Sequence, residues 1–562
     1  MFSHHSWYTA ASVLLLLFSE TSNAHPGSSG SSRRPPTATV RNGTFTGRYL
    51  PEYDEDLFLS VPFAQPPVGD LRFRHPQSLN TTWTGQKLVT EWGPDCIGYG
   101  SDDWANPRAF SEDCLTLSIV RPAGTRPNAG LPVGFWIHGG GGTQGGGNDP
   151  RYNTSFIVQQ SVENKQPIIA INVNYRKQTW GFISGKEIAA EGSLNNAYFD
   201  QRLALHWIQE NIAAFGGDPG KVTIWGESAG ATSAGVQMIA YGGRDDGLFR
   251  GVVYQSGSPA RGYANISAWQ PTYDNITKAT GCDSSADTLA CLRRLPVDQL
   301  SSIFNSSVTA GGIFGGTVDG DLLVGSGLDQ MRNGQFVRVP MLQGRNHDEG
   351  TMWRKEGVNN DTDWEKWLQS SGYNASVIAN LNVLYPDIPE IGIPATLIGR
   401  PTDPKLGSQY KRTCALAGDV RQHAPRRFMT QMCAKYGVNT YSYHFNVFPA
   451  GVAAATGVTH FAEVAWVFDN TLGVGYQNAV AFPPFAGKPR IYYDMAKWMS
   501  RMWASFIHDL DPNYRGLPVS WPMYTNASKV NLVMDVNATR PLYIEPDIYR
   551  AEAIDFVQKL LA

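Results

Sequence analysis

One stretch restricts the fold of this chain more than any other: residues 215–231, which read F-G-G-D-P-G-K-V-T-I-W-G-E-S-A-G-A. The apolar run at 222–225 predicts a buried strand, and the small residues that follow the serine predict a helix packed closely on a sheet. Ser228 stands between them in a G-x-S-x-G pattern, flanked by Gly226 and Gly230. The glycines permit a sharp turn that lifts the serine hydroxyl to the sheet edge. The pattern therefore predicts a nucleophile elbow.

Buried strands and helices alternate on both sides of this stretch. Residues 194–214 carry apolar side chains at helical spacing. Helical segments predominate at 361–435 and 490–510, which predicts large helical insertions. The alternation predicts an α/β fold with a mostly parallel central sheet flanked by helices on both faces. The strand-like runs lie at 132–137, 168–173, 222–225, 252–255, 339–343, 440–444 and 530–534.

The N-terminal residues predict export. Residues 10–18 form an apolar core that is too short to span a bilayer, and Ser22-Asn23-Ala24 is a small-x-small cleavage site. We therefore expect a signal peptide at 1–24, a Ser-, Gly- and Pro-rich disordered arm at 25–39, and a single domain at 40–562. The chain has no second long apolar run, so we expect no stable membrane anchor. Its net charge of -3 gives no reason to expect a basic surface that binds nucleic acid.

The cysteines and sequons agree with a secreted protein. Six cysteines, an even number, suit an oxidising compartment. Their short spacings favour the pairs Cys96–Cys114, Cys282–Cys291 and Cys414–Cys433, the last with the least support. N-glycosylation is predicted at ten N-x-S/T sequons: Asn42, Asn80, Asn153, Asn265, Asn275, Asn305, Asn360, Asn374, Asn526 and Asn537.

A serine at neutral pH is a poor nucleophile, so Ser228 needs an oxyanion hole, an acid and a base. The glycine run 139–142 follows the strand-like run 132–137, and its N–H groups can face a developing negative charge together with the N–H of Ala229. The acid candidates Asp348 and Glu349 are adjacent after the run 339–343, and spacing alone cannot separate them.

Four histidines in the C-terminal third are candidates for the base: His423, His444, His460 and His508. We favour His460 because it lies where a loop meets a helix, whereas the others lie in polar helical contexts or within a strand. His347 is too close to the acid candidates to bridge them to a distant serine, so we interpret it as an ordinary loop histidine.

Two complete signatures identify a family resemblance. Residues 215–230 match the active-site signature of the type-B carboxylesterase, lipase and cholinesterase family of the α/β-hydrolase fold. Residues 112–122, E-D-C-L-T-L-S-I-V-R-P, match its second signature, and the resemblance covers nearly all of 40–562. It implies Ser228 as nucleophile, Glu349 as acid, His460 as base, and Gly140, Gly141 and Ala229 as oxyanion donors, with no metal or cofactor.

The resemblance also bears on the pocket and the disulfides. The pairs Cys96–Cys114 and Cys282–Cys291 match disulfides common in the family, whereas Cys414–Cys433 has no such support. Gly142 stands where many relatives carry a bulky aromatic residue, which changes the expected shape of the acyl pocket. Trp104 resembles the aromatic residue that receives an ammonium group in cholinesterases, although packing against the disulfide loop is the simpler interpretation.

The expected activity is that of a secreted, fungal-type carboxylesterase acting on a small-molecule ester. The loop 97–113 has no apolar helical stripe and cannot form a lipase flap, which favours an open pocket and soluble esters of short or medium acyl chains. An interfacial lipase, or an enzyme of acyl transfer or lactone processing, is the alternative. A non-catalytic adhesion protein is disfavoured because all three triad positions are occupied. Oligomeric state is not predicted.

Overall fold

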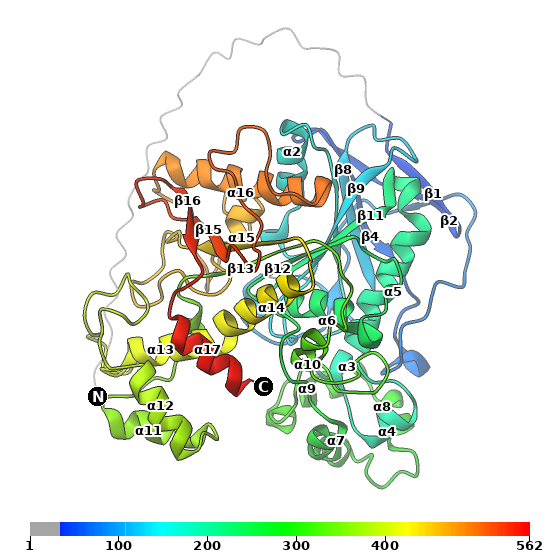
Figure 1. The fold of residues 1–562 in the computed structure, drawn as a ribbon. Coiled ribbons are helices and arrows are strands. Elements are labelled where there is room, and N and C mark those ends of the chain that lie inside the picture. Colours follow the sequence, from blue (N-terminus) through cyan, green and yellow to red (C-terminus); the bar gives the residue numbers. More distant parts are fainter. Residues whose placement is uncertain (1–33, 107, 562) are drawn as a thin grey trace, which may run out of the picture. The chain divides into compact units, whose positions relative to one another are not determined.

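A central sheet of eleven strands organises the protein in the computed structural model, which describes residues 34–106 and 108–561. From one edge to the other (Figure 1) the strands are β16 (Leu542–Pro546), β15 (Val530–Met534), β14 (Thr440–Phe445), β13 (Met341–Asn346), β12 (Gly251–Gln255), β11 (Gly217–Glu227), β9 (Leu131–Ile137), β10 (Ile169–Val173), β8 (Thr116–Pro122), β4 (Glu55–Pro62) and β3 (Arg48–Leu50). The seven strands from β15 to β10 are parallel neighbours, and the pairs at both edges are antiparallel. The predicted mostly parallel sheet is confirmed.

Smaller sheets and many helices complete the described fold. A three-stranded sheet joins β1 (Thr37–Val40), β2 (Gly43–Thr46) and β5 (Gln86–Leu88), and β6 (Asp95–Cys96) pairs with β7 (Phe110–Ser111). The α-helices are α1 (Ser101–Ala105), α2 (Ser155–Glu163), α3 (Gln178–Phe182), α4 (Lys186–Ala190), α5 (Asn196–Asn211), α6 (Ala229–Gly243), α7 (Ile266–Thr280), α8 (Thr288–Arg294), α9 (Val297–Phe304), α10 (Gly327–Arg332), α11 (Asp361–Ser370), α12 (Ala375–Leu384), α13 (Tyr410–Gly418), α14 (Ala424–Lys435), α15 (Val464–Val467), α16 (Arg490–Asp509) and α17 (Ala551–Leu560).

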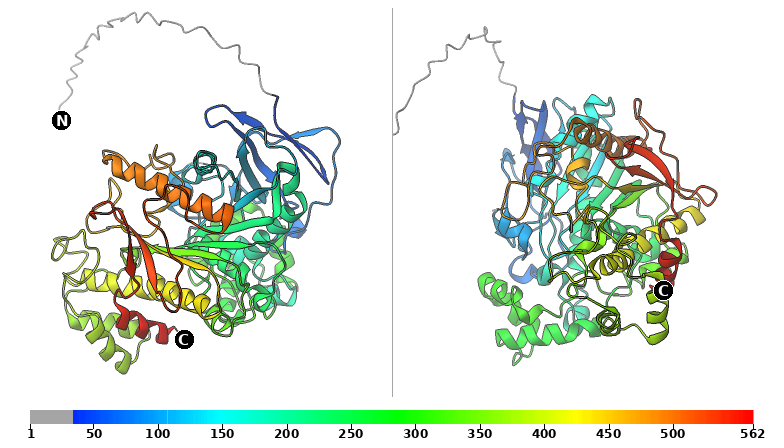
Figure 2. Two further views of the ribbon diagram at one scale, coloured as in Figure 1. Left: turned by 45° about the horizontal axis from the view of Figure 1, so that its top comes forward. Right: turned by 90° about the vertical axis from the view of Figure 1, so that its left-hand side faces the viewer.

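Helices cover both faces of the sheet because successive strand residues point to opposite faces. On β9, Phe135 and Ile137 lie in one hydrophobic core with residues of α5 and α6. Trp136, between them, lies in a second core with residues of α2 and α16. In the left view of Figure 2, α16 (orange) lies on one side of the central strands, and the teal-to-green segment that contains α5 and α6 lies on the other. A parallel sheet buried on both faces explains why its strands read as continuous apolar runs.

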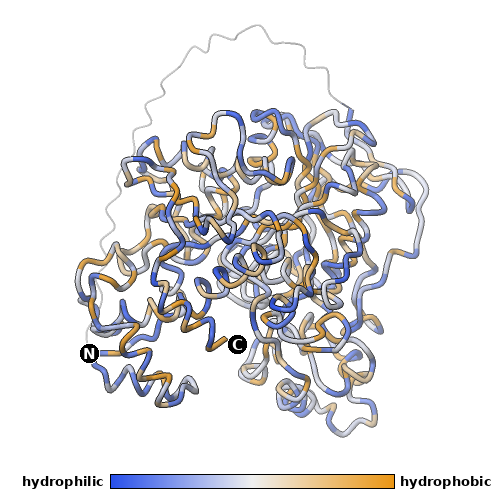
Figure 3. Tube along the Cα trace, viewed as in Figure 1, coloured by the Kyte–Doolittle hydropathy of each residue, from blue (hydrophilic) through white to orange (hydrophobic). Residues whose placement is uncertain are grey.

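The helical insertions fall between strands on the C-terminal side of the serine. Helices α7–α10 lie between β12 and β13, and α11–α14 lie between β13 and β14. The last helix, α17, begins at Ala551, and hydrophobic and hydrophilic residues alternate along it (Figure 3). It buries Ala553, Ile554 and Val557 against the core that contains residues of α11–α13. One face of an otherwise exposed helix thereby completes the packing of the insertion.

The N-terminal segments depart in part from expectation. The expected signal peptide, and the arm up to residue 33, lie outside the described residues. Strand β1 takes in Thr37–Val40, so the expected arm reaches too far toward the domain: Ala38 and Val40 are buried against Phe45 and its neighbours. Strand β16 was not predicted from sequence, because it is a half-exposed edge strand that ends in a proline.

Two of the three expected disulfides form. Cys96 pairs with Cys114 and Cys282 pairs with Cys291. The predicted pair Cys414–Cys433 is wrong, because both residues are free and buried. They lie on α13 and α14, which a π-helical turn at Asp419–His423 joins into one helical run. At about 1.5 Å of rise per residue the two cysteines are roughly 28 Å apart along that run, far beyond the reach of a disulfide.

We therefore expect two thiols per chain in protein denatured without a reductant. A mass shift of two alkylations under these conditions, rising to six after reduction, would agree with the structure. Replacing Cys414 with Ser should lower the unreduced count from two to one, whereas Cys96→Ser should raise it to three by freeing Cys114. A chain with no free thiol in the unreduced state would contradict the assignment.

Candidate active site

Ser228 lies at the turn between β11 and α6, with φ 57° and ψ −120°. Few non-glycine residues adopt this backbone conformation, so the packing around the turn must hold it. A Cβ on Gly226 would lie 2.5 Å from the carbonyl carbon of Gly230, and one on Gly230 would overlap the carbonyl oxygen of Ile137. The two glycines of the motif are therefore required for the contact between strand and helix, and the turn brings the serine hydroxyl to the carboxyl edge of the sheet.

A chain of hydrogen bonds joins this serine to a histidine and a glutamate. His460 Nε2 lies 2.7 Å from Ser228 Oγ, and His460 Nδ1 lies 2.7 Å from Glu349 Oε2. Glu349 begins the turn after β13, and His460 lies in the loop between β14 and α15. The three side chains come from the same edge of the sheet, where the carboxyl ends of parallel strands meet. Such an arrangement can draw a proton from the serine and hold the imidazole in one orientation.

Glu349 is fixed on its far side as well. Its Oε1 accepts a hydrogen bond from the backbone N–H of Asn346 at 2.9 Å and another from the hydroxyl of Ser256. Asp348 points elsewhere, because its Oδ2 accepts the N–H of Val458 at 2.8 Å. The spacing in the sequence could not distinguish Asp348 from Glu349, but the directions of their side chains do.

The other histidines lie apart from the serine. His347 is 2.9 Å from His444, and His444 Nδ1 is 2.9 Å from Glu545. His423 accepts a hydrogen bond from Arg345 within the core, and His508 pairs with Asp509 near the end of α16. The structure brings His460 alone among the four candidates into contact with Ser228.

The glycine run after β9 turns in front of the serine. Gly140, Gly141 and Gly142 all have positive φ, at 99°, 66° and 76°, a conformation that favours glycine. The backbone N–H groups of Gly140, Gly141 and Ala229 donate to no acceptor among the described residues. Ala229 is the first residue of α6, so its N–H also lies at the positive end of a helix dipole. These are the groups that the sequence predicts for an oxyanion hole.

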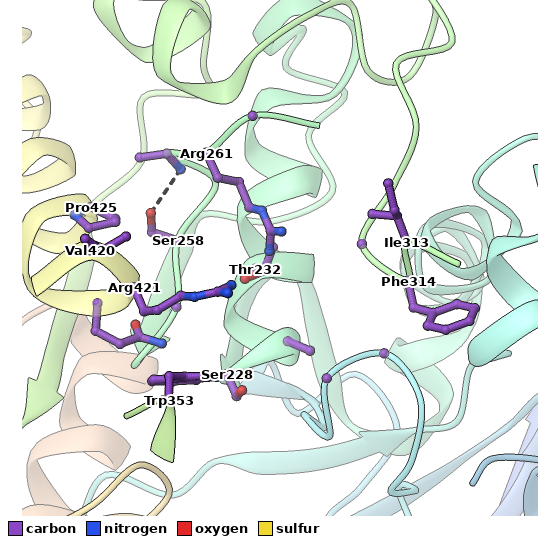
Figure 4. A pocket seen from close by; sticks show the side chains of 18 of the residues that line it. Ser228, Thr232, Ser258, Arg261, Ile313, Phe314, Trp353, Val420, Arg421 and Pro425 are labelled. Atoms are coloured by element: carbon purple, nitrogen blue, oxygen red, sulfur yellow. Dashed lines mark hydrogen bonds between the residues drawn. The ribbon is translucent and has the colours of Figure 1, made fainter. Parts of the chain in front are cut away.

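A cavity of about 860 Å³ opens beside Ser228 (Figure 4). Gly142 lines it, and a Cβ at this position would meet the carbonyl oxygen of Phe314 and, at 3.2 Å, the ring of Phe182. A bulky residue at 142 is excluded because these phenylalanines already occupy the space. Trp353 lines the cavity with its ring centroid 4.7 Å from that of His460.

Trp104 does not join this cavity. Its side chain lies on α1, is 63% exposed, and is absent from the cavity lining. The indole faces solvent. Both expectations for Trp104, a contact with substrate and packing against the disulfide loop, are therefore wrong.

Two further glutamates lie close to His460, and neither was predicted from the sequence. Glu227 Oε1 lies 3.3 Å from His460 Nε2, and Glu463 accepts hydrogen bonds from Asn346 at 2.6 Å and Gln255 at 3.2 Å. Both are fully buried, as is Glu349. Their signals were present in the sequence: Glu227 precedes the serine within the G-x-S-x-G motif, and Glu463 follows His460 by one helical turn.

This cluster shifts the protonation of the site. Burial alone lowers the pKa of His460, but the nearby carboxylates of Glu227 and Glu349 outweigh burial and raise that pKa to about 9. Burial raises the pKa of Glu227 well above its usual value, and the pKa of Glu463 is raised for the same reason. The titration of His460 is therefore coupled to that of Glu227, whose Oε1 lies 3.3 Å from His460 Nε2.

Buried ion pairs fix the loop closed by Cys96–Cys114. Arg108 lies 2.7 Å from Asp95 and 2.9 Å from Asp149, and Arg151 lies 2.8 Å from Asp102. Asp103 accepts the N–H of Gly145 at 2.9 Å, which ties α1 to the glycine-rich turn. Breaking a buried pair leaves an uncompensated charge and costs about 3–5 kcal/mol. The loop is therefore held against the fold at several points.

No cluster of three or more His, Cys, Asp or Glu residues in the described chain could hold a metal ion.

Glu349→Gln should lower kcat on the order of 10³-fold or more, because an amide no longer holds and stabilises the imidazolium that forms during reaction. Asp348→Asn should lose much less, because Asp348 contacts the backbone of Val458 and not His460. Steady-state kinetics of the two variants, with circular dichroism to establish folding, tests the assignment. An inactive Asp348→Asn beside an active Glu349→Gln would reverse it.

Glu227→Gln should move the acid limb of the kcat/KM pH profile to lower pH. The carboxylate raises the pKa of His460, so its removal lowers that pKa, and the free base persists to lower pH. Glu210→Gln, which alters an exposed carboxylate on α5, is the matched control and should leave the profile in place. An unchanged acid limb in Glu227→Gln would contradict the coupling between Glu227 and His460.

Comparisons with known proteins identify the family of the chain. The sequence profile of the carboxylesterase family matches residues 34–553. Lipase 4 of Diutina rugosa is 34% identical and the match covers 92% of this chain and 95% of that protein. A secreted triacylglycerol lipase of Gibberella zeae is 31% identical over 93% of this chain and 90% of its own.

The fold has a solved counterpart. The crystal structure of EstA from Aspergillus niger superposes with a TM-score of 0.80 at 26% identity, covering 94% of this chain and 98% of EstA. A profile match over nearly the whole chain, relatives above 30% identity and this superposition lead to one conclusion. The chain belongs to the carboxylesterase family and is a carboxylic-ester hydrolase of the α/β-hydrolase fold.

Proposed function

We propose that Ser228, His460 and Glu349 are the catalytic triad of this hydrolase. The observation that carries the proposal is the unbroken path of hydrogen bonds from Ser228 Oγ through both nitrogens of His460 to Glu349, with 2.7 Å at each step. His460 takes the serine proton as the hydroxyl oxygen attacks the ester carbonyl. Glu349 holds Nδ1–H and stabilises the imidazolium.

The oxyanion is stabilised by backbone donors in this proposal. The N–H groups of Gly140, Gly141 and Ala229 receive the negative charge of the tetrahedral intermediate. The imidazolium then gives its proton to the leaving alcohol, and an acyl-serine remains. Water, deprotonated by His460, attacks that ester and releases the acid. A second alcohol in place of water would give acyl transfer through the same intermediate.

We infer that the substrates are soluble esters of short or medium acyl chains. An interfacial lipase uses a mobile amphipathic flap, and the corresponding loop here holds a single short helix, α1, tied down by the ion pairs of Arg108 and Arg151. The lipase alternative is favoured by a different observation, since the named relatives from Diutina rugosa and Gibberella zeae are lipases.

We also infer that the protein is secreted and glycosylated. Two disulfides and a relative described as secreted support export, and all the sequon asparagines except Asn42 and Asn153 are exposed. None of the helices within residues 34–561 is long and apolar enough to cross a membrane.

Ser228→Ala should fold normally and lower turnover on p-nitrophenyl butyrate by on the order of 10⁴ or more, because the nucleophile is absent. A fluorophosphonate should label the natural chain once, at Ser228, and should not label the variant. Thr232→Ala, which changes a neighbouring hydroxyl on α6 in the cavity, is the control and should still be labelled. Equal turnover in Ser228→Ala would refute the proposed mechanism.

The choice between esterase and lipase is tested by rate against tributyrin concentration through its solubility limit. A curve that saturates below the limit is expected, because an anchored loop needs no oil surface to open. A jump in rate as droplets form would establish the lipase alternative. The same curve for Arg108→Gln, in which the loop loses the ion pairs of Arg108 with Asp95, Asp103 and Asp149, shows whether the anchors suppress such a jump.

A further inference from the structure

Two arginines reach into the cavity beside Ser228. Figure 4 shows the side chain of Arg261 entering from the loop after β12 and that of Arg421 entering from the turn between α13 and α14. They are the only charged side chains among the described residues that line the cavity. The remaining lining is hydrophobic or carries uncharged polar groups, so no side chain in the described part of the wall balances the two positive charges.

Neither guanidinium makes a hydrogen bond or ion pair with another described residue. Other arginines nearby are paired: Arg426 lies 2.6 Å from Asp547, and Arg550 lies 2.8 Å from Asp419. Arginine keeps its charge across the pH range in which proteins work. Two cations that share one cavity without an acid raise its electrostatic free energy, and an anion between them lowers it.

Backbone hydrogen bonds hold Arg261 in place. The N–H of Arg261 donates to Pro259 at 2.7 Å, and its carbonyl accepts the N–H of Gly327 at 3.0 Å. Its guanidinium lies beside the loop of Gly315, where a Cβ would be 3.6 Å from Nη2. In Figure 4 the side chain of Arg261 extends toward that of Arg421, and Ile313 and Phe314 lie on the other side of the view.

Arg421 is placed by the π-helical turn Asp419–His423. Asp419, on one side of it, binds Arg550 and the hydroxyl of Tyr385, the latter at 2.8 Å, and His423, on the other, binds Arg345. These buried contacts fix the turn in the core while Arg421 faces the cavity. Single π-turns inside α-helices are frequent at functional sites.

We propose that this hydrolase is selective for esters that carry a carboxylate on one arm, and that Arg261 and Arg421 bind that carboxylate. The inference rests on the esterase function proposed above and specifies its substrate class. Guanidinium groups bind carboxylates through paired, charge-assisted hydrogen bonds. The hydrophobic lining, including Phe182, Phe314 and Leu416, contacts the hydrocarbon between the ester and the charge. Half-esters of dicarboxylic acids have this chemistry.

The test uses p-nitrophenyl half-esters of dicarboxylic acids of graded length and, for each, a neutral partner in which the free carboxylate is a methyl ester. At the best length, kcat/KM for the anionic ester should exceed that for its neutral partner about tenfold or more. Added salt should shrink this ratio, because the interaction is electrostatic and the cavity is open to water. A second series with the carboxylate on the phenol tests the alcohol arm.

Arg261→Gln and Arg421→Gln keep hydrogen-bonding groups but remove the charge. Each should lower kcat/KM for the anionic ester by about 5- to 20-fold and change the neutral ester by less than about twofold. Arg126→Gln, an exposed arginine in the loop between β8 and β9, is the matched control and should change neither. Equal rates for anionic and neutral esters in both series, with no effect of either variant, would overturn the proposal.

A measurement of binding distinguishes failure of this proposal from failure of the esterase function on which it rests. Calorimetric titration of Ser228→Ala with the best anionic half-ester should give a Kd that weakens by a similar factor when Arg261→Gln or Arg421→Gln is added. Hydrolysis of p-nitrophenyl butyrate without an anionic preference would refute only the substrate class. Selective binding without Ser228-dependent hydrolysis would refute the mechanism and support the arginine site.

Discussion

The contact between β11 and α6 on either side of Ser228 is the constraint on which the rest of the site depends. The serine adopts a backbone conformation that most residues avoid, and it does so because Gly226 and Gly230 let strand and helix touch. Its hydroxyl then stands at the carboxyl edge of the sheet, where β13 and β14, the strands that precede Glu349 and His460, also end. A parallel sheet collects these distant residues at one edge, and the glycines allow the nucleophile to reach them.

Electrostatics gives the site its second organising feature. Three buried carboxylates, those of Glu227, Glu349 and Glu463, surround the single imidazole of His460. Only Glu349 accepts its Nδ1–H, while Asn346 and Gln255 satisfy Glu463 through hydrogen bonds. The acidic groups thus gather behind the histidine, whereas the cavity in front of the serine carries the positive charges of Arg261 and Arg421. In the substrate class proposed above, those two charges attract the carboxylate into the cavity.

Local patterns explain what the sequence could predict. Ser228, the glycine run and the central strands depend on neighbours along the chain, and those positions agree with the structure. The choice between Asp348 and Glu349 depends on which side chain faces a loop more than a hundred residues away, so only the family resemblance favoured Glu349 before the fold was known. Arg261 and Arg421 gave no signal, because a charge is assigned to a cavity only by tertiary packing. The Cys414–Cys433 pair failed because spacing does not reveal that two helices run on as one.

The buried cysteines on that helical run have a consequence for the durability of the disulfides. A thiol attacks a disulfide as the thiolate, and burial raises the pKa of both Cys414 and Cys433, so the folded protein protects its bridges from exchange. A newly made chain has no such protection, because its six cysteines are equally exposed. The native bridges join residues 18 and 9 apart, whereas Cys414 and Cys433 are 19 apart, so loop length alone does not exclude that pair. The helical run excludes it once formed, because it holds the two thiols apart and buries them.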